Sequence, residues 1–316
     1  MGVRADPRRA VVTAAAPVRL SLMLSVTVLS LALLGCQAAS RPARPDVALD
    51  PSQQEELVAA EALYRERDPA FAEVRDRLAA EPRTAWWLTR LMLYDLVRSV
   101  DAVEATDNTF LGAVATGQAN PLAGEPLEHL QQIGAAAVPA IVDDMLRSPY
   151  ADRRRLGADV LVQLGPDSIA PLVPLLGDPE DKVRREVVRV AGAVVAPAAT
   201  ALLEQAVQDR AFVVRAAAFA GLAARGAPQA DRLRRGLAEE ADPYVRRVIA
   251  RGLGALADRP TAAALIDYYA DALDRQDYEG VRVADGSLRR ISGVATARDL
   301  AFWRAWLASW PGPQER

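Results

Sequence analysis

A valine followed by an arginine recurs along this chain at a fixed spacing. Val183-Arg184, Val214-Arg215 and Val245-Arg246 stand 31 residues apart, and Arg153-Arg154 precedes the first pair by 30. Apolar residues follow each valine four and eight positions later: Val187, Ala218 and Ile249, then Ala191, Leu222 and Leu253. Such offsets lie along one side of an α-helix, so each unit contains an amphipathic helix. The period predicts a stack of similar helical units that bury their apolar faces against one another.

A second series of short amphipathic segments lies between these helices, at 138–147, 168–176, 198–208, 228–239 and 261–273. Glycines at 134, 165, 177 and 226 are typical of the turns between them. A capping side chain followed by proline predicts the start of each first helix, in Asp178-Pro179, Asp242-Pro243 and more weakly Ser148-Pro149. No stretch alternates convincingly with a period of two, so we expect an all-α fold, an α-solenoid of helix pairs.

Two motifs within this pattern resemble the HEAT repeat: Gly134-Ala135-Ala136-Ala137-Val138-Pro139 and Asp178-Pro179-Glu180-Asp181-Lys182-Val183-Arg184. The resemblance covers roughly residues 125–273. It departs from the family at Asp209-Arg210, where HEAT repeats have Asp-Pro, and in a two-residue shortening before Val245. By this resemblance the repeated arginines form a structural ladder of ion pairs and carbonyl contacts between adjacent repeats: Arg154, Arg184, Arg215 and Arg246. The alternative is an anion-binding ridge.

Both ends of the repeat region carry aromatic residues. Trp303, Trp306 and Trp310 share one helix face in the segment 276–316, which resembles the closing unit of bacterial HEAT-repeat proteins. We expect that segment to cover the last repeat, which every solenoid needs for solubility, and an aromatic ligand platform is the alternative. Residues 52–104 predict three helices, broken at Asp68-Pro69 and Glu81-Pro82, and the segment 52–126 is expected to be an N-terminal helical cap or degenerate repeat with a long loop. Residues 127–275 then make up the HEAT-like repeats.

The only cysteine of the chain, Cys36, follows Leu33-Leu34-Gly35 at the end of an apolar run of fifteen residues. Four arginines precede that run, as in an export signal, and the run is short for a membrane span of about 20 residues. The segment resembles a bacterial lipobox. That resemblance implies a signal peptide over 1–35, a diacylglyceryl group on Cys36 and a flexible tether over 36–51. An ordinary secretory signal with a free cysteine and an uncleaved anchor are the alternatives.

The location and partners follow from the residues around that cysteine and from charge. Gln37, rather than aspartate, follows Cys36, which by resemblance favours the periplasmic face of the outer membrane over the inner membrane. The net charge is −3 and becomes more negative without residues 1–35, which hold four Arg and one Asp. An acidic chain argues against a nucleic-acid partner, which needs a basic stripe. We expect membrane lipid, through the acylated cysteine, and another protein as partners.

Recognisable catalytic motifs are missing from the sequence. His129 is the single histidine, and no second histidine or spare cysteine completes a metal site with it. Asp143-Asp144 and Glu239-Glu240 are adjacent on helices and therefore diverge by about 100°. We expect no catalytic residue, no metal and no cofactor, and hence a non-enzymatic scaffold that binds another envelope protein or peptide. A HEAT-like enzyme or small-molecule binder and a structural subunit of an envelope complex are the alternatives.

The segment 106–124 does not fit the repeat pattern, because helix connections normally run about 2 to 8 residues. Its apolar residues Phe110 and Leu111 leave three interpretations open: a disordered connection, a cover over the first repeats, or a partner-binding loop.

Overall fold

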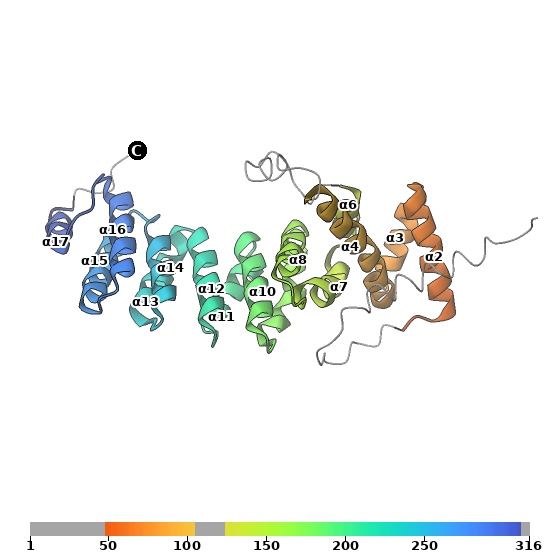
Figure 1. The fold of residues 1–316 in the computed structure, drawn as a ribbon, viewed down its shortest axis with the longest axis horizontal. Helices are drawn as coiled ribbons and strands as arrows, with labels where there is room; N and C mark the ends of the chain where they lie inside the picture. The colour runs from red at the N-terminus through yellow and green to blue at the C-terminus, as the bar shows by residue number, and fades with distance from the viewer. Residues whose placement is uncertain (1–47, 105–123, 311–316) are drawn as a thin grey trace, which may run out of the picture. The chain divides into compact units, whose positions relative to one another are not determined.

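The repeat pattern forms consecutive pairs of helices in the computed structural model, which describes residues 48–104 and 124–310 (Figure 1). All regular structure within these residues is helical, as predicted. The first helices of the pairs are α8 (Ala151–Gln163), α10 (Asp181–Ala193), α12 (Phe212–Ala224), α14 (Pro243–Leu253) and α16 (Tyr278–Ser292). The second helices include α7 (Val138–Ile141), α9 (Ile169–Leu172), α11 (Pro197–Ala206), α13 (Ala230–Glu239) and α15 (Arg259–Asp274).

The first helices pack directly on one another, α10 on α12, α12 on α14 and α14 on α16. Small residues allow their close approach. A Cβ atom added to Gly221 of α12 would lie 3.0 Å from the Cα atom of Gly192 on α10 and 2.9 Å from the side chain of Leu203. A Cβ atom on Gly252 of α14 would lie 2.5 Å from that of Ala223. The distance between neighbouring first helices is therefore set by positions where any side chain would collide.

One continuous apolar core runs through the unit formed by Ala48–Arg316. Val187, Ile249 and Leu253 of the predicted apolar stripe are all fully buried in it. The pattern of four and eight residues after each valine thus marks the face that each first helix turns toward its neighbours. Burial of each such side chain contributes about 1.5 to 3 kcal/mol relative to exposure, so the stripe is a main source of stability for the row.

The N-terminal helices are α2 (Pro51–Glu66), α3 (Phe71–Ala79), α4 (Pro82–Glu104) and α6 (Glu125–Ile133). The first three match the predicted pieces, and the breaks fall at Asp68-Pro69 and Glu81-Pro82 as expected. Asp50 caps α2 in a capping box with Gln53, in which each side chain accepts from the backbone N–H of the other residue. Trp86 and Met92 of α4 are buried, whereas Trp87 and Tyr94 are half-buried, so only part of the aromatic and methionine set of this helix is enclosed.

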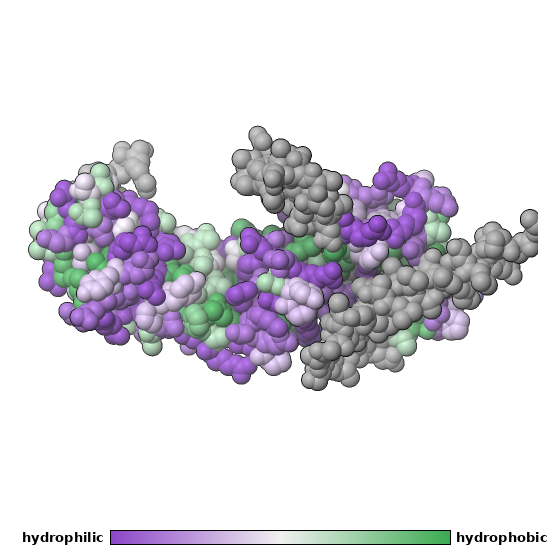
Figure 2. Space-filling model, viewed as in Figure 1, coloured by the Kyte–Doolittle hydropathy of each residue, from purple (hydrophilic) through white to green (hydrophobic). Residues whose placement is uncertain are grey.

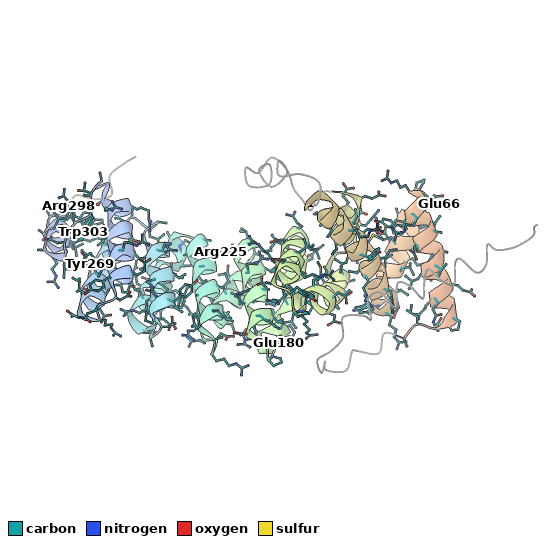
Figure 3. The ribbon with its side chains drawn as sticks, in the orientation of Figure 1. Glu66, Glu180, Arg225, Tyr269, Arg298 and Trp303 are labelled. Atoms are coloured by element: carbon teal, nitrogen blue, oxygen red, sulfur yellow. The ribbon has the colours of Figure 1, made fainter. Side chains whose placement is uncertain are left out.

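The C-terminal helix α17 (Leu300–Ser309) covers the end of the repeats. Trp303 is fully buried, and its indole N–H donates to the Asp285 carboxylate on α16 at 3.0 Å. The same carboxylate oxygen accepts the backbone N–H of Arg298 at 3.0 Å, and the Tyr269 hydroxyl donates to the Arg298 carbonyl at 3.2 Å. Tyr269, Arg298 and Trp303 gather at this end in Figure 3. The predicted capping role of Trp303 agrees with this burial.

Two of the three expected helix starts are placed differently. Asp242 does cap α14, because its side chain accepts from the N–H groups of Tyr244 and Val245. At Asp178-Pro179, however, the carboxylate accepts from the N–H of Glu180 in a turn, and α10 begins later, at Asp181. Ser148 likewise bonds the Tyr150 N–H, and α8 begins at Ala151. The cause is chain length, since six residues separate Asp178 from Arg184 and only four separate Asp242 from Arg246.

Several predicted features lie outside the described residues: the signal segment 1–35, Cys36, Gln37, most of the tether, and Phe110 and Leu111 of the segment 106–124. Within the described ranges, no helix is both long enough and apolar enough to span a membrane.

Candidate functional site

The arginine ladder joins neighbouring repeats at the edge where the first helices begin. The Arg184 guanidinium donates from one terminal nitrogen to the carbonyls of Asp178 and Pro179, at 2.8 and 3.2 Å. Its other two nitrogens donate side by side to the two oxygens of Asp209 in the next repeat, at 2.7 and 2.8 Å. The Arg184 side chain is almost fully buried. Each such arginine therefore fixes the turn before its own helix and the turn before the next.

Arg215 repeats this arrangement one unit later. It donates to the carbonyls of Asp209 and Arg210 and grips Glu240 with two bonds of 2.8 Å. The two acceptor carboxylates also bind the backbone. Asp209 accepts the N–H of Ala211 at 2.8 Å, and Glu240 accepts the N–H of Asp242 at 2.9 Å. Each carboxylate thus both holds an arginine and fixes a local turn.

The ladder is less regular at its two ends. Arg154 bonds the carbonyls of Ser148 and Pro149 and makes no ion pair within the described residues, because Asp178, the carboxylate in the equivalent position, pairs with Arg147 at 3.2 Å. Arg246 pairs with Asp271 and lies over the Tyr268 ring, 4.8 Å from its centroid. Arg246 makes no carbonyl hydrogen bond in the described residues, although α14 begins three residues before it, as α10 and α12 begin three residues before Arg184 and Arg215. All four arginines predicted for the ladder are thus engaged in contacts within the fold.

Electrostatics favour the ionised form of the ladder carboxylates. Burial raises the pKa of Asp209, but the hydrogen bonds from Arg184 and the Ala211 N–H outweigh it and hold this pKa below its ordinary value. At Glu240 the bond from Arg215 is the largest influence and lowers the pKa. The charged ladder therefore persists at neutral pH, and the guanidinium groups of Arg184 and Arg215 bind protein acceptors through all three nitrogens.

A second set of bonds links the opposite edge of the first helices. Arg225, just after α12, donates to the carbonyls of Ala191 and Val194 on the preceding repeat, at 2.7 and 2.6 Å. Arg290 of α16 reaches the Arg251 carbonyl at the end of α14, at 3.1 Å. Figure 3 shows Glu180 and Arg225 at opposite edges of the row of helices. Both edges of the first-helix layer are therefore fixed by arginines.

The remaining candidate residues lie apart from one another or in ion pairs. Asp143 pairs with Arg147 and Asp144 with Arg90, and Glu239 is exposed on α13. No group of three His, Cys, Asp or Glu side chains that could hold a metal occurs in the described ranges.

His129 lines a shallow cavity of about 170 Å³ at the N-terminal end, with Tyr64, Phe71 and Glu125. Its ring packs edge-on against Phe71, with centroids 4.9 Å apart, and its Nδ1 atom lies 3.1 Å from the guanidinium of buried Arg75. A guanidinium only donates, so Nδ1 is the acceptor and the proton of the neutral ring resides on Nε2. The cavity therefore presents aromatic walls, the His129 Nε2–H and the Glu125 carboxylate, which pairs with Arg67 of the same lining at 3.3 Å.

Comparison with known proteins identifies the repeat type. Residues 138–223 match the family model of HEAT repeats, which confirms the predicted HEAT-type helical repeats. The chain is similar to a solved structure, the complex of CpcE and CpcF of phycocyanin lyase from Nostoc sp. PCC7120, with 20% identity and a TM-score of 0.32. That similarity covers 86% of this chain and 99% of the other. No curated protein matches the chain.

The prediction that the chain is not an enzyme is wrong as a conclusion from sequence. The solved structure to which the chain is similar is described as a complex of phycocyanin lyase, an enzyme, and this contradicts the prediction. A TM-score of 0.32 assigns no lyase activity to this chain. The missing motifs and the single histidine describe the sequence and do not exclude catalysis.

Sequence reasoning missed two features of the site. The carboxylate column Asp178, Asp209, Glu240 and Asp271 has a spacing of 31, which matches the spacing of Arg184, Arg215 and Arg246, and that match was the available signal. The second feature is the exposure of Phe212 and Tyr244 at the starts of α12 and α14. Bulky aromatic residues one or two positions before the Val-Arg pairs, in an alanine-rich chain, were the signal there.

Proposed function

We propose that this chain is a lipid-anchored HEAT-type scaffold of the bacterial cell envelope that binds a protein partner. The inter-repeat arginine ladder carries this proposal. It fixes consecutive helix pairs into one row whose outward side chains are left free for contacts. Extended rows of this kind bind partners over long surfaces, because each repeat adds a similar patch beside the last.

The anchor and location are proposed from the sequence around Cys36. The arginine-rich start, the apolar run and the solitary cysteine support lipidation at Cys36, and Gln37 supports the periplasmic face of the outer membrane. The fifteen residues after Cys36 span roughly 20 Å as a flexible chain, enough to hold the repeats away from lipid headgroups.

Fractionation tests the anchor. Wild-type chain expressed in a bacterial host should sediment with membranes, with an intact mass that begins at Cys36 and includes acyl chains. Cys36→Ala should be released into the soluble fraction with residues 1–35 still attached or cut elsewhere. An unmodified Cys36 in the wild-type mass spectrum would remove the lipid anchor from the proposal.

Affinity capture tests the partner. The wild-type full chain, captured from detergent-solubilised envelope, should retain one or a few envelope proteins. The control variant Arg153→Ala, altered at an exposed residue, should retain the same proteins equally well. A partner that co-purifies at fixed stoichiometry through every step would identify a structural subunit of a larger complex. Capture of nothing above the level of empty resin contradicts the scaffold proposal.

The cavity at His129 favours a second candidate, small-molecule binding. Its Nε2–H donor, the Glu125 acceptor and the rings of Tyr64 and Phe71 converge on one concave site, as binding pockets require. Native mass spectrometry of the purified full chain should then show a bound mass increment that Glu125→Gln weakens. A spectrum of freshly purified wild type that shows no added mass counts against small-molecule binding at this cavity.

A further inference from the structure

The exposed aromatic residues of the repeats all lie at one edge. Tyr150 directly precedes α8, Phe212 begins α12, Tyr244 is the second residue of α14, and Tyr278 begins α16. Their exposed fractions are 61%, 44%, 51% and 72%, respectively. We call these four residues the aromatic edge. It coincides with the edge at which the arginine ladder runs, and on α10 the position equivalent to Phe212 holds Asp181.

Two members of the aromatic edge form a preformed platform. The rings of Phe212 and Tyr244 meet edge to face, with centroids 5.9 Å apart, across the boundary between two repeats. The helix starts that carry them are held by Arg215 and Glu240, so little ordering remains to be done when a ligand arrives. Figure 2 shows apolar surface over the stretch labelled α11 and α12 in Figure 1, with hydrophilic surface on both sides.

Charged residues of both signs lie beside the aromatic edge, and near Phe212 and Tyr278 they include carboxylates without partners. Lys182 and Arg275 pair with Glu180 and Asp271, Arg210 donates to the Pro179 carbonyl, and exposed Arg153 near Tyr150 makes no hydrogen bond or ion pair in the described residues. Asp181 and Asp274 are exposed and make no hydrogen bond or ion pair in the described part of the chain. The edge therefore combines open aromatic faces with unpaired negative charge.

We propose that the aromatic edge docks a basic segment of a partner protein, whose arginine or lysine side chains stack on Phe212 and Tyr244. A cation is attracted to the face of an aromatic ring, and nearby carboxylates such as Asp181 add charge-assisted hydrogen bonds. An acidic segment would meet repulsion at the same place, which makes the edge selective by charge. This inference rests on the proposed scaffold function and assigns it a surface and a partner chemistry.

Fluorescence anisotropy with two labelled peptides tests the docking chemistry. The full chain in detergent is titrated against a short peptide of alternating arginine and alanine and against its glutamate counterpart. Wild type should bind the arginine peptide and leave the glutamate peptide free. The double variant Phe212→Ser/Tyr244→Ser should weaken arginine-peptide binding about tenfold, from the loss of two cation–π contacts. Val195→Ser, at another exposed apolar position, should bind like wild type.

The outcomes separate this inference from the scaffold proposal. Equal thermal melts for all variants show that the fold is intact, since each altered side chain is exposed. Unchanged affinity of the double variant, or equal binding of both peptides, overturns the inference. Self-association of wild type that the double variant abolishes also overturns it, because the occupant is then a second copy. If the wild type and the double variant retain the same partner equally in affinity capture, the scaffold proposal is supported. The aromatic edge is then not the surface that binds that partner.

Discussion

Arg184 shows how one repeated side chain serves two turns at once. Its guanidinium is buried, and four hydrogen bonds satisfy it, two to carbonyls and two to Asp209. A buried charge of this kind is tolerated only because its partners are in place. Loss of the arginine leaves the Asp209 carboxylate and two carbonyls short of donors, and the penalty falls on both repeats.

We therefore expect Arg184→Ala to lower the free energy of unfolding by about 3 kcal/mol, the lower range for breaking one side of a buried ion pair. Arg153→Ala is the matched control, one unit earlier but exposed, and should stay within about 0.5 kcal/mol of wild type. Urea denaturation followed by circular dichroism measures both. Equal midpoints for the two variants would mean that the ladder does not stabilise the row.

The ladder carboxylates also predict a dependence on pH. Asp209 and Glu240 have pKa values held below their ordinary ones in the fold, so the unfolded chain binds their protons first as pH falls. Their stabilisation is complete above the ordinary carboxyl pKa of about 4 and is lost below it, as pH falls through the folded-state values.

Melting temperature should therefore fall steeply between pH 5 and pH 3 in wild type, on the basis of these ordinary carboxyl values. The double variant Asp209→Asn/Glu240→Gln should start from a lower melting temperature at pH 7 and show a shallower fall. Parallel curves for the two proteins would assign the acid sensitivity to other carboxylates.

At the scale of helices, small residues decide how closely neighbours pack. Gly221 and Gly192 face each other between α12 and α10, and the Leu203 side chain closes the third side of that contact. Glycine in a helix normally costs about 0.5 to 1 kcal/mol relative to alanine. Here that cost is offset by contacts across the interface that a side chain would prevent.

The prediction is that Gly221→Ala destabilises the protein by about 1 to 3 kcal/mol, as overpacking of a filled interface does. Gly286→Ala in α16 is the opposite case, since nothing lies within 4 Å of its added Cβ atom, and it should stabilise by about 0.5 to 1 kcal/mol. Differential scanning calorimetry of the two variants should show melting-temperature shifts of opposite sign, and shifts of the same sign would refute this packing argument.

The positions of the helices could be predicted, because the spacing of apolar residues along a helix is a property of that segment alone. The helices α4 and α15 are examples. Helix starts were harder. Asp178-Pro179 and Asp242-Pro243 read alike, yet only the second begins a helix, because Arg184 binds the carbonyls of the first turn from six and five residues away. The partner of Arg154 was also hidden, since a competing arginine, Arg147, takes Asp178 through a contact between segments distant in sequence. The second outcome depends on a tertiary contact that a single repeat does not contain, whereas the first reflects hydrogen bonds within one repeat.

On the scale of the whole molecule, stability is a sum of similar contributions from neighbouring repeats. The ladder supplies one such contribution per interface, and it is weakest at Arg154, which has no carboxylate partner in the described residues. Opening should therefore begin on the N-terminal side of α10. Hydrogen exchange should show faster exchange for α8 than for α12, both of thirteen residues, and the reverse order would show that the ladder does not govern local opening.

The constant interval between each arginine and its carboxylate has a consequence for how such a chain changes length. Excision of residues 185–215 removes one whole period and would bring Arg184 into the place of Arg215, 25 residues before Glu240. Arg184 and Arg246 would then still each meet an acid, whereas a cut three residues shorter would shift the register and strand a buried charge. We expect the first excision to yield a folded, shorter protein with a cooperative melt and the second to aggregate. This architecture can therefore become longer or shorter by the gain or loss of complete 31-residue repeats, without other changes to the sequence.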